Sequence, residues 1–164
     1  MAGRHLRAIL TLPIVVLVVI PGLLLLSGPP ASPGWGLPGG VGLGLGLIAA
    51  GLGLMGATIG LFGRTGGGTL APWDPPTRLV VAGPYRYVRN PMITGVVLVL
   101  LGEVVAFGSW RLLVWCLTFA GGNLAWIPLV EEPPLRARFG ESYAEYCRHV
   151  PRWIPRLTPY DPGD

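Results

Sequence analysis

Two short polar segments hold most of the residues in this chain that could do chemistry. The first, Gly83–Pro91, reads GPYRYVRNP, and the second, Glu131–Gly140, reads EEPPLRARFG. Arginine can clamp a carboxylate or phosphate with two parallel hydrogen bonds, and carboxylates accept hydrogen bonds from hydroxyl or ammonium groups. Tyrosine rings can cover a flat or cationic group. Together these residue types predict a binding site for a small, charged molecule.

The sequence between the two segments is apolar and can return the chain to the same side of a membrane. Residues 91–107 and 112–130 are two apolar runs joined by the short turn Gly108–Arg111. A helix rises about 1.5 Å per residue, so each run fits the hydrocarbon core. A hairpin of two such helices places both polar segments at one membrane boundary. Interfacial anchoring by tyrosine and arginine is the simpler alternative for the first segment.

The composition predicts an integral membrane protein. Of the 164 residues, 51% are hydrophobic and only 12% are charged, whereas about 25% charged residues is typical of a soluble domain. In lipid such apolar runs must be helical, because unpaired backbone groups are not tolerated there. We therefore predict an all-α integral membrane protein, a single membrane domain 1–164 with about four transmembrane helices and a C-terminal cytoplasmic amphipathic helix. The predicted transmembrane helices are 8–26, 41–62, 91–107 and 112–130.

The arginines set the predicted orientation. All of them except Arg111 fall in the N-terminal segment, in the loop before residue 91 or in the C-terminal tail. Positive charge favours the cytoplasmic side of a membrane. We therefore expect both termini to be cytoplasmic, and we expect a bacterial inner membrane as the location.

Charge and metal-ligand spacing exclude other classes of site. The net charge of +4 is modest, and its placement does not indicate nucleic-acid binding. Cys116 lies in an apolar run and Cys147 in the polar tail, and His5 and His149 have no ligand spacing. We expect no metal cofactor and no disulfide framework.

The second predicted helix is rich in glycine. Gly42 and Gly46, and likewise Gly56 and Gly60, are small residues four positions apart, which let two helix backbones approach closely. A glycine-rich nucleotide loop is the alternative, but the run is apolar throughout and no strand precedes it. We predict a packing face, either within the helix bundle or between two copies of the chain in a homo-oligomer.

The tail from Glu131 to Val150 predicts one amphipathic helix, because its apolar residues recur every three or four positions. The residues at this spacing are Leu135, Phe139, Tyr143, Tyr146 and Val150. Pro151 ends the helix, and Trp153 suits a membrane interface. The last residues, Thr158–Asp164, are expected to be frayed.

Three polar features have two interpretations each from the residues alone. Glu131 and Glu132 either form an acidic helix start or bind a cation. Asn123, in the fourth predicted helix, either bonds to a neighbouring helix or contacts a ligand. Glu103, inside the third, is either functional or paired with Arg111 across the turn.

The two polar segments and the tail also resemble one family of membrane enzymes. The residues that carry the resemblance are Gly83-Pro84-Tyr85-Arg86-Tyr87-Val88-Arg89-Asn90-Pro91-Met92, Gly95, Glu131-Glu132, Phe139-Gly140, Tyr143, Tyr146 and Val150-Pro151-Arg152. This pattern, over residues 78–156, resembles the isoprenylcysteine carboxyl methyltransferase and phospholipid methyltransferase superfamily. The resemblance implies an enzyme in the lipid bilayer that uses S-adenosylmethionine to methylate a lipophilic acceptor (a carboxylate, an amine or a thiol) at the cytoplasmic boundary.

The resemblance implies a cofactor site built from the boundary segments 78–91 and 131–156. We assign catalytic roles to Arg89, Asn90 and Glu132. The predicted cofactor-binding residues are Gly83, Tyr85, Arg86, Tyr87, Val88, Arg89, Asn90, Pro91, Asn123, Glu131, Glu132 and Tyr143. The arginine and asparagine are expected to hold the amino-acid end of the cofactor, and the tyrosines to wall its pocket. The two carboxylates either hold its ribose or ammonium or order the arginines.

Two positions depart from the family pattern. Asn90 stands where the family often has His, and Ile93 where it often has Tyr. Asparagine does not titrate near neutral pH, so a mechanism with a histidine base at this position does not fit. These departures favour one alternative, a non-catalytic, glycine-packed membrane scaffold. A second alternative is a relative of sterol-type reductases, whose C-terminal region resembles this superfamily and which would use NADPH. Cofactor binding separates the three.

Overall fold

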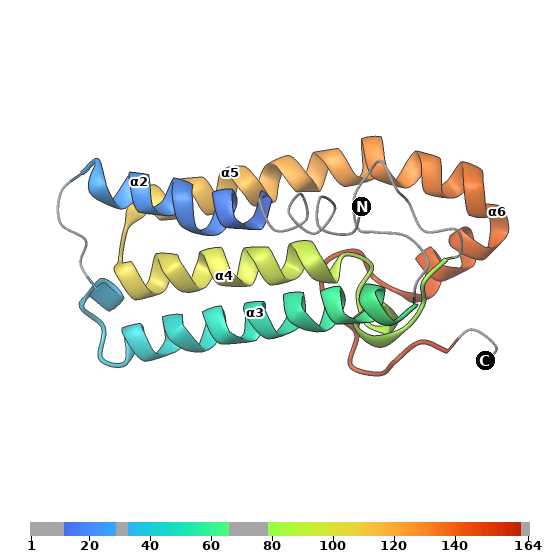
Figure 1. The fold of residues 1–164 in the computed structure, drawn as a ribbon, viewed down its shortest axis with the longest axis horizontal. Coiled ribbons are helices and arrows are strands. Elements are labelled where there is room, and N and C mark those ends of the chain that lie inside the picture. The colour runs from blue at the N-terminus through green and yellow to red at the C-terminus, as the bar shows by residue number, and fades with distance from the viewer. Residues whose placement is uncertain (1–11, 29–32, 66–78, 162–164) are drawn as a thin grey trace. The chain divides into compact units, whose positions relative to one another are not determined.

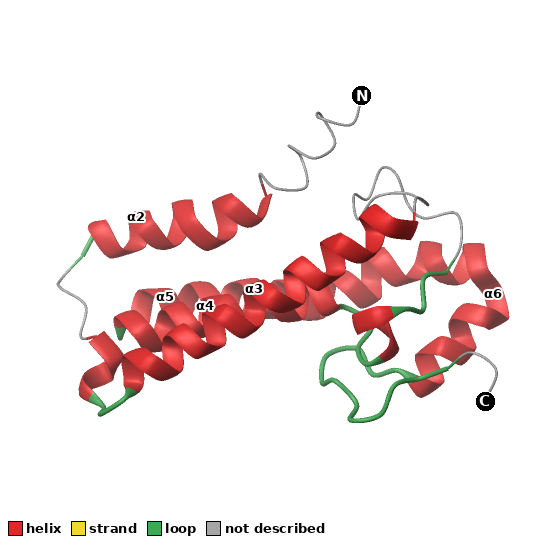
Figure 2. Cartoon of the chain, turned by 60° about the horizontal axis from the view of Figure 1, so that its bottom comes forward, coloured by secondary structure: helices red, strands yellow, loops and turns green. Residues whose placement is uncertain are grey.

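The computed structural model describes residues 12–28, 33–65 and 79–161 (Figure 1). Within these ranges every regular element is helical, and Figure 2 shows helices and loops there but no strand. The predicted all-α class is therefore confirmed for the described part of the chain.

In the described ranges the principal elements are α-helices, most of them labelled in Figure 1. They are α2 (Ile20–Leu26), α3 (Gly40–Thr65), α4 (Pro91–Phe107), α5 (Trp110–Trp126) and α6 (Glu132–His149). A π-helical turn, Val15–Val19, leads into α2, and a second, Ile127–Glu131, joins α5 to α6. Short 3-10 turns cover Pro33–Gly36 and Gly83–Arg86.

The chain divides into two compact units. One consists of Met1–Gly53 and Gly95–Gly121, and the other of Leu54–Thr94 and Gly122–Asp164. All of the predicted site residues belong to the second unit, whereas Glu103 belongs to the first.

In the first unit α3 and α4 pack with their backbones in contact (Figure 1). A Cβ placed on Gly51 would lie 2.6 Å from the carbonyl oxygen of Gly95, and one on Gly44 would lie 2.6 Å from the backbone nitrogen of Ala106. On the opposing helix, a Cβ on Gly102 would lie 2.6 Å from the carbonyl oxygen of Gly44. Only glycine permits this approach, which increases the dispersion contact between helices where lipid provides no hydrophobic drive.

The glycines that make this contact are not the ones that the sequence spacing singled out. At Gly42, Gly46, Gly56 and Gly60 an added Cβ meets nothing within 4 Å. The prediction that these pairs pack inside the bundle is therefore wrong for the described part of the chain. Their use between two copies of the chain stays a prediction.

Arg111 hydrogen-bonds to the C-terminal end of α2 and does not pair with Glu103. Its Nη1 donates to the carbonyl oxygen of Leu24 at 3.3 Å, in the last turn of α2, where a cation complements the helix dipole. Of the two interpretations of Glu103, the ion pair with Arg111 is not found between these two described residues, and a functional role stays a prediction. Glu103 is buried, and its Oε2 has no hydrogen-bond partner.

Two helical runs in the described ranges are long and apolar enough to cross a membrane, Gly40–Leu61 and Trp110–His149. Only 22% and 11% of their apolar windows are buried, so they differ from the core helices of a soluble protein. Leu12–Leu26 and Pro91–Phe107 are apolar but shorter. Four membrane crossings therefore stay a prediction, as does the cytoplasmic orientation.

The second unit contains a continuous helix where the sequence predicted a break. From Gly122 onward the helix passes through the π-helical turn Ile127–Glu131 and then Pro133 and Pro134 into α6. A π-helical turn widens the helix, which helps it to pass prolines that lack a backbone N–H. The bend comes later, at Gly140, which has φ 53° and ψ −127° and divides α6 into two helical pieces.

The residues after α6 form an ordered segment, Val150–Asp161, which we name the C-terminal strap. Main-chain hydrogen bonds link it to the loop before α4. The N–H of Arg89 donates to the carbonyl oxygen of Pro151 at 2.9 Å, and the N–H of Arg156 donates to the carbonyl oxygen of Tyr87 at 3.0 Å. Tyr160 also donates its N–H to the carbonyl oxygen of Arg86 at 2.9 Å. The prediction of fraying is therefore wrong for Thr158–Asp161, and residues 162–164 lie outside the described ranges.

We expect the close contact of α3 with α4 to make two neighbouring glycines respond oppositely to alanine. Gly51→Ala should destabilise the protein by about 1–3 kcal/mol, because the added methyl must push apart two backbones. Gly53→Ala has open space and should be neutral or stabilising by up to about 1 kcal/mol, the gain in helix propensity. Thermal unfolding in detergent measures both variants. Equal effects would contradict the packing described here.

Candidate functional site

The loop Gly83–Pro91 is held in place by its own turn and by contacts from distant segments. Gly83 opens the 3-10 turn with a φ of 52°, which favours glycine. The carbonyl oxygen of Tyr85 accepts a hydrogen bond from the hydroxyl of Tyr146 at 2.7 Å, and the Val88 side chain is 1% exposed. Pro91 is the first residue of α4, as predicted.

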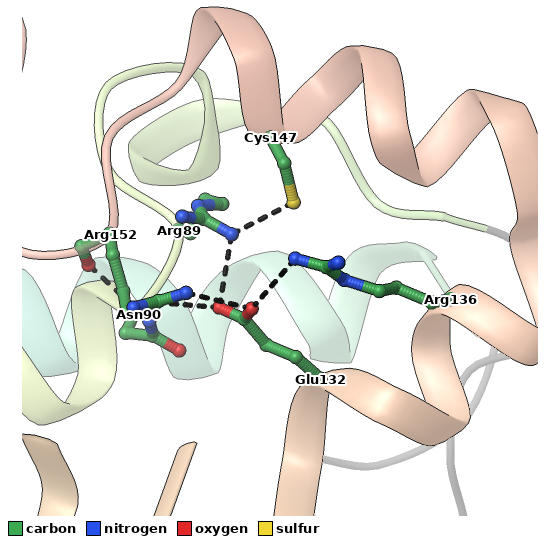
Figure 3. Close-up of polar contacts among 6 residues, drawn as sticks. All are labelled: Arg89, Asn90, Glu132, Arg136, Cys147 and Arg152. Atoms are coloured by element: carbon green, nitrogen blue, oxygen red, sulfur yellow. Dashed lines mark hydrogen bonds and ion pairs between the residues drawn. The ribbon is translucent and has the colours of Figure 1, made fainter. Parts of the chain in front are cut away.

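Glu132 is the centre of a charged network in the second unit (Figure 3). Its side chain is 4% exposed. Oε1 accepts from Arg89 Nη1 at 3.0 Å and from Arg152 Nε at 2.6 Å, while Oε2 accepts from Arg152 Nη2 at 2.9 Å. Arg136 lies 3.6 Å from Oε2 on the next turn of α6. Three arginines from separate parts of the unit therefore converge on one buried carboxylate.

The network has more positive charge than negative. One carboxylate faces three guanidinium groups, and the Arg89 side chain is only 11% exposed. The Nε of Arg89 is buried and has no hydrogen-bond partner. An unsatisfied buried donor costs about 1–3 kcal/mol, so such groups are uncommon in native proteins. The unpartnered Nε and the excess positive charge fit the binding of an anionic group, such as a carboxylate.

A cysteine contacts the same nitrogen of Arg89 that binds Glu132 (Figure 3). The Sγ of Cys147 accepts from Arg89 Nη1 at 2.8 Å. A cavity of about 360 Å³ adjoins this contact along α6. Its lining residues are Arg136, Gly140, Ala144, Cys147 and Arg148. Arg136 and Cys147 of the charged network thus also border this open hollow on α6.

Asn90 and Arg86 are engaged by the C-terminal strap. The Nδ2 of Asn90 donates to the carbonyl oxygen of Arg152 at 3.3 Å (Figure 3). Arg86 Nε donates to the carbonyl oxygen of Tyr160 at 3.0 Å, and its Nη2 forms an ion pair with Asp161. Both predicted site residues therefore order the loop and the strap in this structure.

The tyrosines divide between the core and the surface. Tyr143 and Tyr146 are buried with Val150 in a cluster that also includes Leu79 and Val81, which precede the loop, and Tyr160 of the strap. Burial raises the pKa of Tyr85, Tyr143 and Tyr146, so these phenols stay neutral at physiological pH and can donate a hydrogen bond. The Tyr87 side chain is 36% exposed.

The structure brings together only some of the predicted site residues. Arg89 and Glu132 are in direct contact, and Asn90 joins them through the backbone of Arg152. Glu131 is exposed, unlike its neighbour Glu132, and it lies near the Tyr85 hydroxyl. Asn123 is half-buried on α5, and its role in a site stays a prediction.

Three residues of the network had not been predicted as site residues: Arg136, Cys147 and Arg152. Arg136 follows Glu132 by four positions, and this helical spacing is a signal that could have found it. Arg152 is brought in by the fold of the strap, and no local pattern in the sequence indicates its contact with Glu132. The same holds for Cys147 and Arg89.

The family comparison matches most of the chain that forms this site. The sequence model described as Phospholipid methyltransferase matches residues 40–142, which is more than half of the chain. The match starts earlier than the predicted resemblance over 78–156, at the beginning of α3, and it ends within α6. It includes Arg89 and Glu132, whereas Arg152 lies beyond its end.

The other two comparisons gave no match. No curated protein and no solved structure matches the chain. The family match, the helical fold and the two apolar helices long enough to cross a membrane agree with one another. The chain belongs to the phospholipid methyltransferase family, within the superfamily of membrane methyltransferases that also contains the isoprenylcysteine carboxyl methyltransferases.

Proposed function

We propose that this protein is a membrane-embedded, S-adenosylmethionine-dependent methyltransferase that acts on a lipophilic acceptor at the cytoplasmic membrane boundary. The observation that carries the proposal is Arg89, which is held by the buried Glu132 and has an unpartnered Nε. The family match supplies the reaction class. The apolar, exposed surfaces of α3 and α5 suit an acceptor that arrives through lipid.

The residues of the site fit the functional groups of the cofactor. S-adenosylmethionine has a carboxylate and an ammonium at one end, a ribose diol and an adenine at the other, and a sulfonium between them. Arg89 would hold the carboxylate through its buried, unpartnered Nε together with a terminal nitrogen, since Arg–carboxylate pairs favour two-point contact. The exposed Glu131 would accept from the ammonium or the diol, and Tyr85 and Tyr87 would cover the adenine or the sulfonium.

Glu132 would order the arginines rather than touch the cofactor. Both of its oxygens already accept hydrogen bonds from arginine, and its side chain is almost fully buried. We therefore propose different roles for the two neighbouring carboxylates: Glu132 orders the arginines, and Glu131 holds the ribose or the ammonium of the cofactor. Asn90 would act in the same supporting way, because its amide holds the backbone of Arg152.

When bound, the cofactor supplies an electrophilic methyl group on its sulfonium. The chain's own residues need only bind, orient and exclude water, because in-line displacement requires no protein nucleophile. A carboxylate acceptor also needs no base. An amine or thiol acceptor must lose a proton, and His149 is occupied by a stack on Tyr160 and a hydrogen bond with the Glu145 carbonyl oxygen.

Cofactor binding tests the proposal directly. In detergent, S-adenosylmethionine and S-adenosylhomocysteine should each raise the melting temperature, whereas NADPH should not, because only compounds that bind the native state stabilise it. Stabilisation by NADPH alone would favour a reductase. A protein that no compound stabilises would favour the non-catalytic scaffold.

Arg89→Lys should weaken the binding of S-adenosylhomocysteine by about tenfold or more, because lysine keeps the charge but loses the planar fork that holds a carboxylate. Arg138→Lys is the matched control, since Arg138 is exposed and lies over the ring of Phe139 away from the network. Isothermal calorimetry in nanodiscs measures both. Equal affinity for the two variants would remove Arg89 from the site.

The two cysteines should differ in alkylation by iodoacetamide. Cys147 borders the cavity and should react, whereas Cys116 is 1% exposed and should not. S-adenosylhomocysteine should slow the reaction of Cys147, because the Arg89 that contacts its sulfur would be held by the ligand. Peptide mass spectrometry gives the rate at each cysteine. An unchanged rate at Cys147 in saturating ligand would place the cofactor elsewhere.

A further inference from the structure

The C-terminal strap carries one arginine into the centre of the charged network. Arg152 meets Glu132 with two hydrogen bonds, from Nε to Oε1 at 2.6 Å and from Nη2 to Oε2 at 2.9 Å. This is the two-point geometry in which a guanidinium binds a carboxylate most strongly. The hydrogen bonds with Glu132 raise the pKa of Arg152, so its charge is secure.

The backbone around Arg152 is fixed to the same loop that contains Arg89. Arg89 donates its N–H to the carbonyl oxygen of Pro151 at 2.9 Å, and Asn90 Nδ2 donates to the carbonyl oxygen of Arg152 at 3.3 Å. Residues 89–90 and 151–152 therefore form one small hydrogen-bonded unit around Glu132. A change in how Arg152 binds the carboxylate therefore alters the hydrogen bonding of Arg89, because both arginines bind Glu132.

The two arginines use different edges toward the carboxylate. Arg152 presents its Nε edge and engages both oxygens of Glu132 (Figure 3). Arg89 reaches Oε1 through Nη1 alone, and its Nε stays without a partner. Both arginines could make the two-point contact with a carboxylate, but Glu132 has made it with Arg152.

We infer that Arg152 is a positioning residue that occupies Glu132 so that the buried Nε of Arg89 stays unpaired and can bind the anionic group of the cofactor. This inference rests on the proposed function. In the absence of Arg152, the Glu132 carboxylate is free to turn and pair with the Nε edge of Arg89. The protein's own carboxylate then competes with the carboxylate of the ligand for the same guanidinium.

Arg152→Ala should therefore weaken the binding of S-adenosylhomocysteine by about tenfold or more, the scale of one lost charge-assisted contact. Arg156→Ala is the control within the strap. The Arg156 side chain bonds the carbonyl oxygen of His149 and the hydroxyl of Thr158, does not contact Glu132, and should leave the affinity within about twofold of the parent.

The double variant Glu132→Gln/Arg152→Ala distinguishes positioning from general damage to the fold. A glutamine has no charge with which to compete for Arg89, so the double variant should bind S-adenosylhomocysteine at least about threefold more tightly than Arg152→Ala alone. Arg152→Lys keeps the charge but not the two-point geometry and should fall between the parent and Arg152→Ala. Thermal unfolding establishes that each variant is folded.

Each failure has a separate signature. A parent protein that binds no S-adenosyl compound overturns the proposed function and this inference with it. A parent that binds, together with an equally tight Arg152→Ala, overturns the inference alone. So does a double variant that binds more weakly than Arg152→Ala, because losses that accumulate indicate that both residues only support the fold.

Discussion

The buried carboxylate of Glu132 is the interaction on which the described site depends. Its side chain is 4% exposed, and a buried charge that loses its partner destabilises a protein by about 3–5 kcal/mol. Arg89, Arg136 and Arg152 therefore have to converge on it, although they come from the loop before α4, from α6 and from the C-terminal strap. Main-chain hydrogen bonds between the loop and the strap hold Arg89 and Arg152 beside this carboxylate. In this arrangement the buried Nε of Arg89 has no hydrogen-bond partner.

The apolar runs were predictable because helices are the structure that satisfies the backbone in lipid. The third predicted helix, 91–107, has the same bounds as α4. The predicted break at Glu131 was wrong, because the π-helical turn Ile127–Glu131 carries the helix past its prolines. The glycine spacing singled out the wrong residues of α3, because the close contact uses Gly44 and Gly51 and depends on the positions that α4 presents, including Gly102.

The site was predictable in part for a similar reason. Arg89, Asn90 and Glu132 lie in compact polar segments with a recognisable order, and the structure brings these segments together. Arg152 and Cys147 reach the network only because the chain bends at Gly140 and returns along the loop. That return is made by main-chain hydrogen bonds between segments far apart in the sequence, and such bonds have no signature in residue type.

Transfer of a labelled methyl group tests whether this protein is a methyltransferase whose cofactor is held by Arg89. The protein, reconstituted in nanodiscs with native membrane extract and S-adenosylmethionine labelled in its methyl group, should move label into a lipid-soluble product. Arg89→Lys should lose most of this transfer, whereas Arg138→Lys should retain it. Transfer that is equal in the two variants, or label that never enters the extract in the presence of the parent protein, would contradict this prediction.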